Sequence, residues 1–414
     1  MPIKLLAWGA NTYGQLGLGY KSESCLTPME VLSDGTHLAM RDVISVAGGG
    51  GHTLIMDSTG SLFSCGWNSK GQLGRKDLEG EDNVDDKLAV VGVEEEDRAV
   101  GIACGWDSSY CVTWGNKLLV WGSNAYGQLG VPKKEYLTVG KPMQLSGLDD
   151  VTHVAAGLRH VLVLTKDGRV MACGCGSKGQ LGILDDSKLP LKELEEFREV
   201  PDLSSVVQIA CGQNFSAALD SKGQIWVWGD NHHGQLGINP DSEAIVPIPC
   251  CLSTFPNFDF TLAAHEVAKI HCGWTHMVAR TCSSVIINWG RNNYGQLGCH
   301  ESQRPQPWKP QVIDKLEGVR RIAVGAEHNL AMTEDGSALS WGWNEHGNCG
   351  VGDDKNVLLP SPVKVVLPQK VINIGAGCGH SFALVEEKCE NSKVNKGSGM
   401  LPVFSTFPCP SVCM

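Results

Sequence analysis

The chain has 414 residues, among them 50 glycines and 17 cysteines, and carries a formal net charge of −11. Glycine is well above its roughly 7% average while aliphatic and aromatic residues stay frequent, which excludes a disordered chain and favours a folded one rich in turns. The negative charge and the lack of any block of Lys or Arg argue against direct binding of nucleic acid, because that affinity depends on cationic surface.

The N-terminal apolar run is too short for a signal peptide, and no apolar run reaches the roughly 18 residues of a membrane span. The cysteines are odd in number and scattered, which favours reduced thiols over a disulfide framework. We therefore expect a cytoplasmic protein, with a nuclear location also open, that does not insert into membranes.

Along the chain, one motif occurs seven times: an aromatic residue or Cys, then Gly-x-Asn-x-x-Gly-Gln-Leu-Gly. The fourth copy, from Cys173, lacks the Asn, and the seventh, from Trp341, ends in Gly-Asn-Cys-Gly. The first Gly of each copy recurs every 52–61 residues, at Gly9, Gly66, Gly122, Gly174, Gly229, Gly290 and Gly342. A period of this length is typical of repeat architectures.

A second motif, Gly-x-x-His before an apolar stretch, also occurs seven times. Its fourth position holds His52, Ser108, His160, Phe215, His276, His328 and His380. Because Ser and Phe replace His in two copies, the pattern argues against a set of metal ligands and predicts a structural His bonded within its own blade. Cys104, Cys211 and Cys272, just before the motif Gly, are expected to be small core residues.

Each repeat of about 50 residues contains four predicted strands. In one repeat the first three are residues 151–155, 160–164 and 169–173, and Asp167-Gly168 forms a hairpin turn. The fourth strand carries Pro, as in residues 141–145 and 361–365, which places it at the sheet edge because Pro cannot donate to a ladder.

Four antiparallel strands repeated seven times predict an all-β, seven-bladed β-propeller over residues 1–386. We expect the N-terminal strand, residues 3–8, to pair with the last blade, residues 361–386, and so to close the ring. Residues 387–414 are expected to form a disordered tail.

Three segments between the motifs have expectations of their own. The acidic residues 77–97 are expected to form a solvated, mobile loop, with an electrostatic docking site as the alternative. The charged residues 187–199 are expected to be helical. The long connection 238–266 contains Phe255, Phe258 and Phe260, and either folds back onto blade edges or reaches into a partner as a wedge.

In order and spacing, the two motifs resemble the regulator-of-chromosome-condensation repeat over about residues 3–386. Residues 156–160, 273–276 and 341–347 are similar to a subgroup of that family that regulates secretion. The resemblance implies a monomer with a guanine-nucleotide-exchange-factor-like role, acting on a small GTPase or on a secretory component such as an exocyst subunit.

In the founding exchange factor of the family, GTPase contacts cluster between the Gly and the His of the second motif. The resemblance therefore implies these partner-binding candidates: Trp106, Asp107, Arg159, Asn214, Trp274, Thr275 and Glu327. Exchange requires only that the factor bind the nucleotide-free GTPase better than the loaded form. No catalytic residue, metal or cofactor is expected, and the glycines of residues 174–179 belong to the fourth first-motif copy rather than to a dinucleotide site.

Two other functions stay open. The first is a scaffold whose propeller face docks a secretory or signalling partner without promoting exchange. The second is a tryptophan-based ultraviolet sensor, because some plant members of the family use clustered Gly-Trp-x-His copies and this chain has one at residues 273–276.

Overall fold

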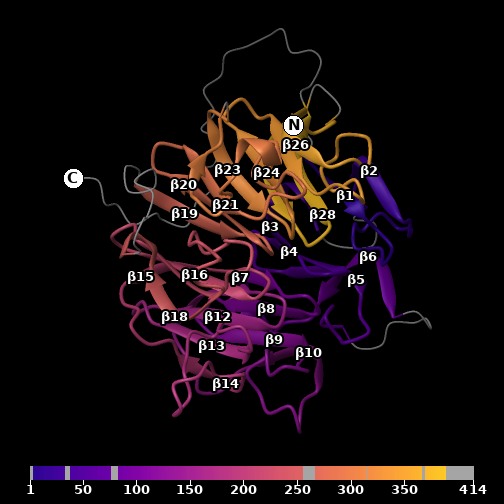
Figure 1. Cartoon of the computed structure of the whole chain (residues 1–414). Helices are drawn as coiled ribbons and strands as arrows, with labels where there is room; N and C mark the ends of the chain where they lie inside the picture. Colours follow the sequence, from indigo (N-terminus) through magenta and orange to yellow (C-terminus); the bar gives the residue numbers. More distant parts are fainter. Residues whose placement is uncertain are drawn as a thin grey trace, which may run out of the picture.

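The computed structural model describes residues 3–32, 38–75, 83–254, 266–314, 316–365 and 369–387. Its strands form seven four-stranded antiparallel sheets that follow one another around a central axis, so the predicted seven-bladed β-propeller is confirmed (Figure 1). Among the described residues, no helix has the length and apolar character that a membrane span requires.

Six blades each use four consecutive strands, of which the first lies nearest the axis and the fourth is outermost. The first three are β3 (Val43–Gly48), β4 (His52–Asp57), β5 (Leu62–Trp67), β6 (Val84–Val91); β7 (Ala99–Cys104), β8 (Ser108–Thr113), β9 (Leu118–Ser123), β10 (Thr138–Gln144); and β11 (Val151–Ala156), β12 (His160–Thr165), β13 (Val170–Cys175), β14 (Glu193–Glu199). The next three are β15 (Val206–Cys211), β16 (Phe215–Asp220), β17 (Ile225–Asp230), β18 (Ile245–Cys251); β19 (Val267–Cys272), β20 (His276–Thr281), β21 (Ile286–Gly290), β22 (Gln311–Val312); and β23 (Val319–Val324), β24 (His328–Thr333), β25 (Ala338–Gly342), β26 (Val357–Pro362).

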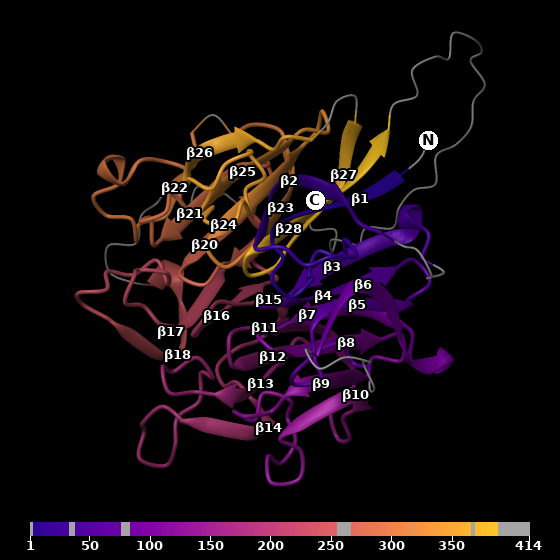
Figure 2. The same ribbon diagram turned by 90° about the vertical axis from the view of Figure 1, so that its right-hand side faces the viewer.

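The seventh blade joins the two ends of the described chain, in the order β2-β1-β28-β27. Its strands are β1 (Ile3–Ala10), β2 (Ser24–Glu30), β27 (Gln369–Ala376) and β28 (His380–Glu387). Figures 1 and 2 both show the indigo β1 beside the yellow strands from the end of the chain. The prediction that the N-terminal strand closes the ring is confirmed, since Ile3 is the register partner of Glu386 and Gly9 that of His380.

The predicted composition of that blade was wrong in one respect. The Pro-bearing strand expected at residues 361–365 overlaps β26, which pairs with β25 in the preceding blade. The reason is the chain order within a blade, in which the outer strand directly follows the third strand. The edge position expected for Pro is confirmed, because β26 and β10, with Pro142, are both outermost.

Two segments that the sequence predicts to be a loop and a helix contain outer strands instead. The helix expected at residues 187–199 was wrong, because Glu193–Glu199 is the edge strand β14 and pairs with β13. Within the acidic segment 77–97, Val84–Val91 is the edge strand β6, where Asp85 bonds Arg75 at 2.7 Å. Charged side chains are common on edge strands, where they discourage pairing with another chain.

The remaining expectations for connections fall partly outside the described residues. Within residues 238–266, Ile245–Cys251 is strand β18 and Leu252–Thr254 is one 3-10 turn. Phe255, Phe258 and Phe260 lie outside the described residues, as do residues 76–82 and the tail from residue 388.

The second-motif histidines join neighbouring blades. Each Nε2 lies 2.8–3.0 Å from a side-chain oxygen of the next blade, in the pairs His52–Ser109, His160–Ser216, His276–Asn329, His328–Ser381 and His380–Thr53. The expectation of a bond within the same blade was therefore wrong. The ring reaches across because it lies against the motif Gly: a Cβ on Gly157 would come within 2.3 Å of the His160 ring.

The partner residues explain which copies lack His. Ser108 and Phe215 occupy the His position in the two copies that lack His. In the next blade, the position that would hold the hydrogen-bond partner is Val161 or Met277, whose side chains have no oxygen. A polar partner side chain also makes a second hydrogen bond to the preceding blade. For example, Ser109 Oγ donates to the Gln72 carbonyl at 2.8 Å. The first motif adds to the same seams, since the Trp121 indole N–H donates to that carbonyl at 2.9 Å.

The blade built from β19 to β22 has a two-residue outer strand, and Arg304 completes its edge. The side chain is buried, and its guanidinium donates to the Asn288 carbonyl at 3.1 Å, to Asn288 Oδ1 at 2.7 Å and to the Val312 carbonyl at 3.4 Å. These bonds join the loop before β22 to both strands and give the buried guanidinium its acceptors.

Replacing Arg304 by Met should lower the free energy of unfolding by about 2–4 kcal/mol, because the side-chain stem is retained while the hydrogen bonds of the guanidinium to β21 and β22 are lost. Urea unfolding measures the change. The matched control is Arg320→Met, since the Arg320 side chain is exposed on β23. Equal stability of the two variants would contradict this role of Arg304.

Candidate partner-binding face

All seven Gly-x-x-His turns lie at one end of the ring, because each connects the inner strand of a blade to the second strand. The first-motif turns lie beside them: the backbone N–H of Trp67 donates to the Gly51 carbonyl at 2.8 Å, and that of Ser123 to the Asp107 carbonyl at 2.9 Å. We call the surface formed by these two sets of turns the turn face.

Backbone hydrogen bonds link the Gly-x-x-His turns around the axis. The backbone N–H of the residue after the motif Gly donates to the backbone carbonyl of the equivalent residue in the next blade. The pairs are Gly50–Trp106 (2.9 Å), Leu158–Gln213 (3.2 Å), Gln213–Trp274 (3.2 Å), Trp274–Ala326 (2.7 Å) and Ala326–Cys378 (3.2 Å). These bonds fix the positions from which the candidate side chains project. The turn face is therefore preorganised, which lowers the entropic cost of binding a partner.

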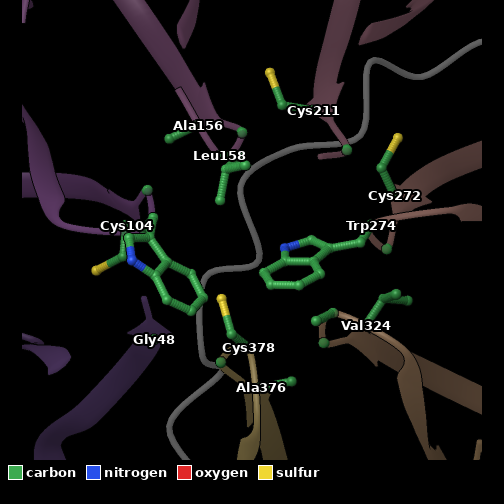
Figure 3. A pocket seen from close by; sticks show the side chains of 18 of the residues that line it. Gly48, Cys104, Ala156, Leu158, Cys211, Cys272, Trp274, Val324, Ala376 and Cys378 are labelled. Atoms are coloured by element: carbon green, nitrogen blue, oxygen red, sulfur yellow. The ribbon is translucent and has the colours of Figure 1, made fainter. Parts of the chain in front are cut away.

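Trp106 and Trp274 meet at the axis from different blades. Their ring centroids are 5.6 Å apart with the planes tilted by 45°, and Figure 3 shows the Trp274 ring pointing into the centre of the ring of lining residues. Trp106 is 37% exposed and lies over Gly50, where a Cβ would come within 2.7 Å of its indole. The glycine is thus what allows the indole to lie flat across the turn of the preceding blade.

Arg159 is exposed on the turn face with its guanidinium carbon 4.3 Å from the centroid of the Tyr126 ring. The first motif places that ring: the Gln128 side chain accepts from the Tyr126 N–H at 2.8 Å, and the Asn124 side chain donates to the Val131 and Tyr136 carbonyls beyond the turn. Stacking on an aromatic face leaves the guanidinium N–H groups available to a carboxylate or phosphate.

Asp107 and Asn214 are half-buried at the same level. Burial raises the pKa of the Asp107 carboxyl. The backbone carbonyl of the same residue accepts a hydrogen bond from the Ser123 N–H. The structure therefore brings Trp106, Asp107, Arg159, Asn214 and Trp274 to one accessible surface.

The other two candidates point inward. Thr275 and Glu327 are 5% and 7% exposed, and the Thr275 hydroxyl donates to both Glu327 carboxylate oxygens at 2.7 and 3.0 Å. The Gln296 side chain also donates to Glu327, at 2.7 Å. In this structure the two residues join neighbouring blades beneath the face rather than forming part of its surface.

Two aromatic pairs on the turn face escaped the sequence prediction. Tyr13 stacks on Trp67 with a centroid distance of 5.0 Å, and Trp343 contacts His346 edge-on at 5.2 Å. Trp67 and Trp343 directly follow the first-motif Gly, and Tyr13 and His346 precede its second Gly. Those two positions in each repeat were the signal that could have found them.

The structure places the cysteines expected as core residues around the axis. Cys104, Cys211 and Cys272 are half-buried and line an axial cavity with the turn residue Cys378. Burial raises the pKa of the Cys378 thiol to about 12 and also raises that of the Cys272 thiol, so these thiols stay protonated at neutral pH. Among the described residues, no group of three or more His, Cys, Asp or Glu side chains could hold a metal ion.

The chain is thus a closed propeller with a preorganised, aromatic turn face at one end of the ring. The RCC1-like domain profile matches residues 4–383, and the chain belongs to that family. It is 38% identical over 411 residues to the mouse secretion-regulating guanine nucleotide exchange factor, covering 92% of this chain and 83% of the relative.

Two further comparisons agree. The bovine secretion-regulating guanine nucleotide exchange factor is 36% identical over 404 residues, with the same coverage of both chains. The structure of Prp20p from Saccharomyces cerevisiae, a protein that binds Gsp1p and histones, is 23% identical and superimposes with a TM-score of 0.80 over 94% of this chain and 93% of that one. At that identity the likeness concerns the fold.

Proposed function

We propose that this protein is a guanine nucleotide exchange factor that binds a small GTPase through the turn face and regulates secretion, in the cytoplasm and also in the nucleus. The observation that carries the proposal is the Trp106–Trp274 pair, held at the centre of a preorganised face in a chain 38% identical to a protein with that name. The resemblance also suggests a secretory component such as an exocyst subunit as a further partner.

The residues of the face have distinct roles in this proposal. Trp106 and Trp274 supply apolar area at the centre, where interface residues contribute most to affinity. Arg159, oriented by Tyr126, supplies charge beside them. Exchange follows if the face binds the nucleotide-free GTPase better than the loaded form, since binding then shifts the equilibrium toward nucleotide release.

Replacing Trp106 and Trp274 together by Ala should reduce GTPase binding by at least about 30-fold, since a single Trp hot spot contributes about 2 kcal/mol or more. The measurement is capture from cell extract with GDP, with a GTP analogue and after nucleotide removal by EDTA, followed by fluorescent GDP release from the captured GTPase. We expect the strongest capture after EDTA treatment and loss of accelerated GDP release in the variant.

Trp114→Ala is the matched control. This Trp is 74% exposed in the β8–β9 turn, at the opposite end of the strands from the turn face. It should bind and exchange as the wild type does. Partners held equally with and without nucleotide, with no accelerated release, would contradict the exchange proposal and favour the scaffold alternative.

A further inference from the structure

A cavity of 230 Å³ lies on the propeller axis at the turn face (Figure 3). Its lining comes from all seven blades, from the ends of the inner strands and from the Gly-x-x-His turns, and includes Trp106 and Trp274. Every lining residue is Gly, Ala, Val, Leu, Cys or Trp, so no side chain of the lining carries a charge.

The chemistry of this lining excludes most occupants. An ion or a carboxylate would be buried without a charged partner, which is costly. Two of the four thiols bond the preceding blade: Cys104 Sγ lies 3.6 Å from the Ala47 carbonyl and Cys211 Sγ 3.3 Å from the Ala155 carbonyl. Figure 3 likewise shows the Cys211 and Cys272 thiols pointing away from the axis. The Cys378 thiol, in contrast, points toward the centre of the cavity (Figure 3). The lining side chains therefore suit an uncharged group with an apolar body, while backbone groups of the Gly-rich turns supply a comparable polar part of the surface.

The cavity is also large enough and accessible enough for such a group. A dry apolar cavity of about 150 Å³ can bind benzene, so 230 Å³ is sufficient for a Phe or Leu side chain. Among the described residues, neither the Trp106 nor the Trp274 indole N–H makes a hydrogen bond, so packing alone holds the two rings. Trp106 rests on Gly50, which has no side chain to block its movement.

We propose that this cavity receives one aromatic or branched aliphatic side chain of the protein bound on the turn face, with the Trp106 and Trp274 rings packing around it. Because the cavity opens at the centre of that face, the side chain that enters it belongs to the protein bound there. The inference rests on the proposed function for the partner's identity, and its first test is independent of it.

The first test uses toluene, which has the shape of a Phe side chain, and benzoate, which has the same ring with a negative charge. Toluene should produce saturable shifts of the Trp106 and Trp274 indole resonances in NMR spectra of the wild-type protein, and benzoate should not. Filling the cavity by Leu158→Phe with Cys378→Leu, at two side chains that point toward its centre in Figure 3, should weaken toluene binding at least about tenfold. Larger residues are compatible with these sites because Trp106 and Trp274 occupy the equivalent positions in other blades.

Ala125→Val, on an exposed turn residue, is the matched control and should bind toluene as the wild type does. Thermal unfolding of every variant shows whether it is folded at the temperature of the titration. Absence of saturable toluene binding to the wild type, or equal binding to the filled variant, would overturn the proposal.

The second test compares capture of the GTPase by wild type and by the Leu158→Phe/Cys378→Leu variant, which leaves both Trp residues in place. We expect at least about tenfold weaker capture by the filled variant. Equal capture by both would overturn the cavity proposal and leave the proposed function standing. Capture that does not depend on nucleotide would overturn the exchange function, while weaker capture by the filled variant would still support a side-chain site.

Discussion

Acidification from pH 7 to pH 5 should destabilise the propeller by about 8 kcal/mol through His52, His160, His328 and His380 alone. Burial lowers the pKa of His52 and His328 to about 3 and that of His160 and His380 to about 4, from 6.5 in the unfolded chain. Each therefore contributes stability that is complete above pH 6.5 and is lost as the pH falls toward the folded pKa. The expected loss is of the order of a domain's whole stability.

Burial between two blades is the physical cause, and the seam hydrogen bonds determine which ring nitrogen would gain the second proton. The Ser109 hydroxyl donates to a carbonyl, so it must accept from His52 Nε2, which requires that Nε2 carry the proton of a neutral ring. Nδ1 of His52 makes no hydrogen bond in the described structure, so its protonation would place an unpartnered charge between two blades. Burial also lowers the pKa of His276, which adds to the effect in the same direction.

Unfolding midpoints between pH 7 and pH 5.5, above the titration of most carboxylates, measure this dependence. His160→Gln, whose amide can still donate to Ser216, should reduce the loss of stability over this pH range by about 1.3 kcal/mol, because the unfolded His160 takes up its proton around pH 6.5. His300→Gln is the control, because that side chain is exposed. A slope unchanged by His160→Gln would show that the buried histidines are not responsible.

The second large effect concerns ring closure. Deletion of residues 1–10 should abolish cooperative folding, because β1 is the third strand of its blade and pairs with both β2 and β28. Leu5, Leu6 and Trp8 are buried, and their loss alone removes about 5–9 kcal/mol of apolar burial. Circular dichroism and size-exclusion chromatography of the deletion variant test this expectation.

A circular permutant separates the loss of residues from the loss of closure. Lys4 Nζ lies 2.8 Å from a Glu387 carboxylate oxygen, so a short linker can join Glu387 to Ile3. The chain can then open between Ser187 and Lys188, in an exposed segment that precedes β14. We expect the permutant to unfold cooperatively, and a permutant as unstable as the deletion variant would refute the closure argument.

The repeats made the inner part of every blade predictable. Residues 151–155, 160–164 and 169–173 correspond to β11, β12 and β13 within two residues, because buried strands need an apolar pattern and the glycines mark their turns. The outer strand β14 was not predictable, since its charged residues make few buried contacts and its pairing is determined by β13.

For the candidate site, the sequence predicted positions better than orientations. The motif placed seven residues in the Gly-x-x-His turns, and each lies there. Whether a side chain reaches solvent depends on the neighbouring blade, as when Gln296 and Thr275 bond Glu327 beneath the face. The same limit applies to the histidines, whose partners are 53–57 positions away within the chain or, for His380, at Thr53.

The shared seventh blade also has a consequence for synthesis on the ribosome. Gly9 and its register partner His380 are 371 positions apart, which corresponds to roughly 20–75 s of translation at about 5–20 residues per second. During that time β1 can pair with β2, but the edge that later meets β28 has no partner. The nascent chain therefore carries an open strand edge until its last blade emerges, and at this stage it is most exposed to chaperones, proteases and mispairing with other chains.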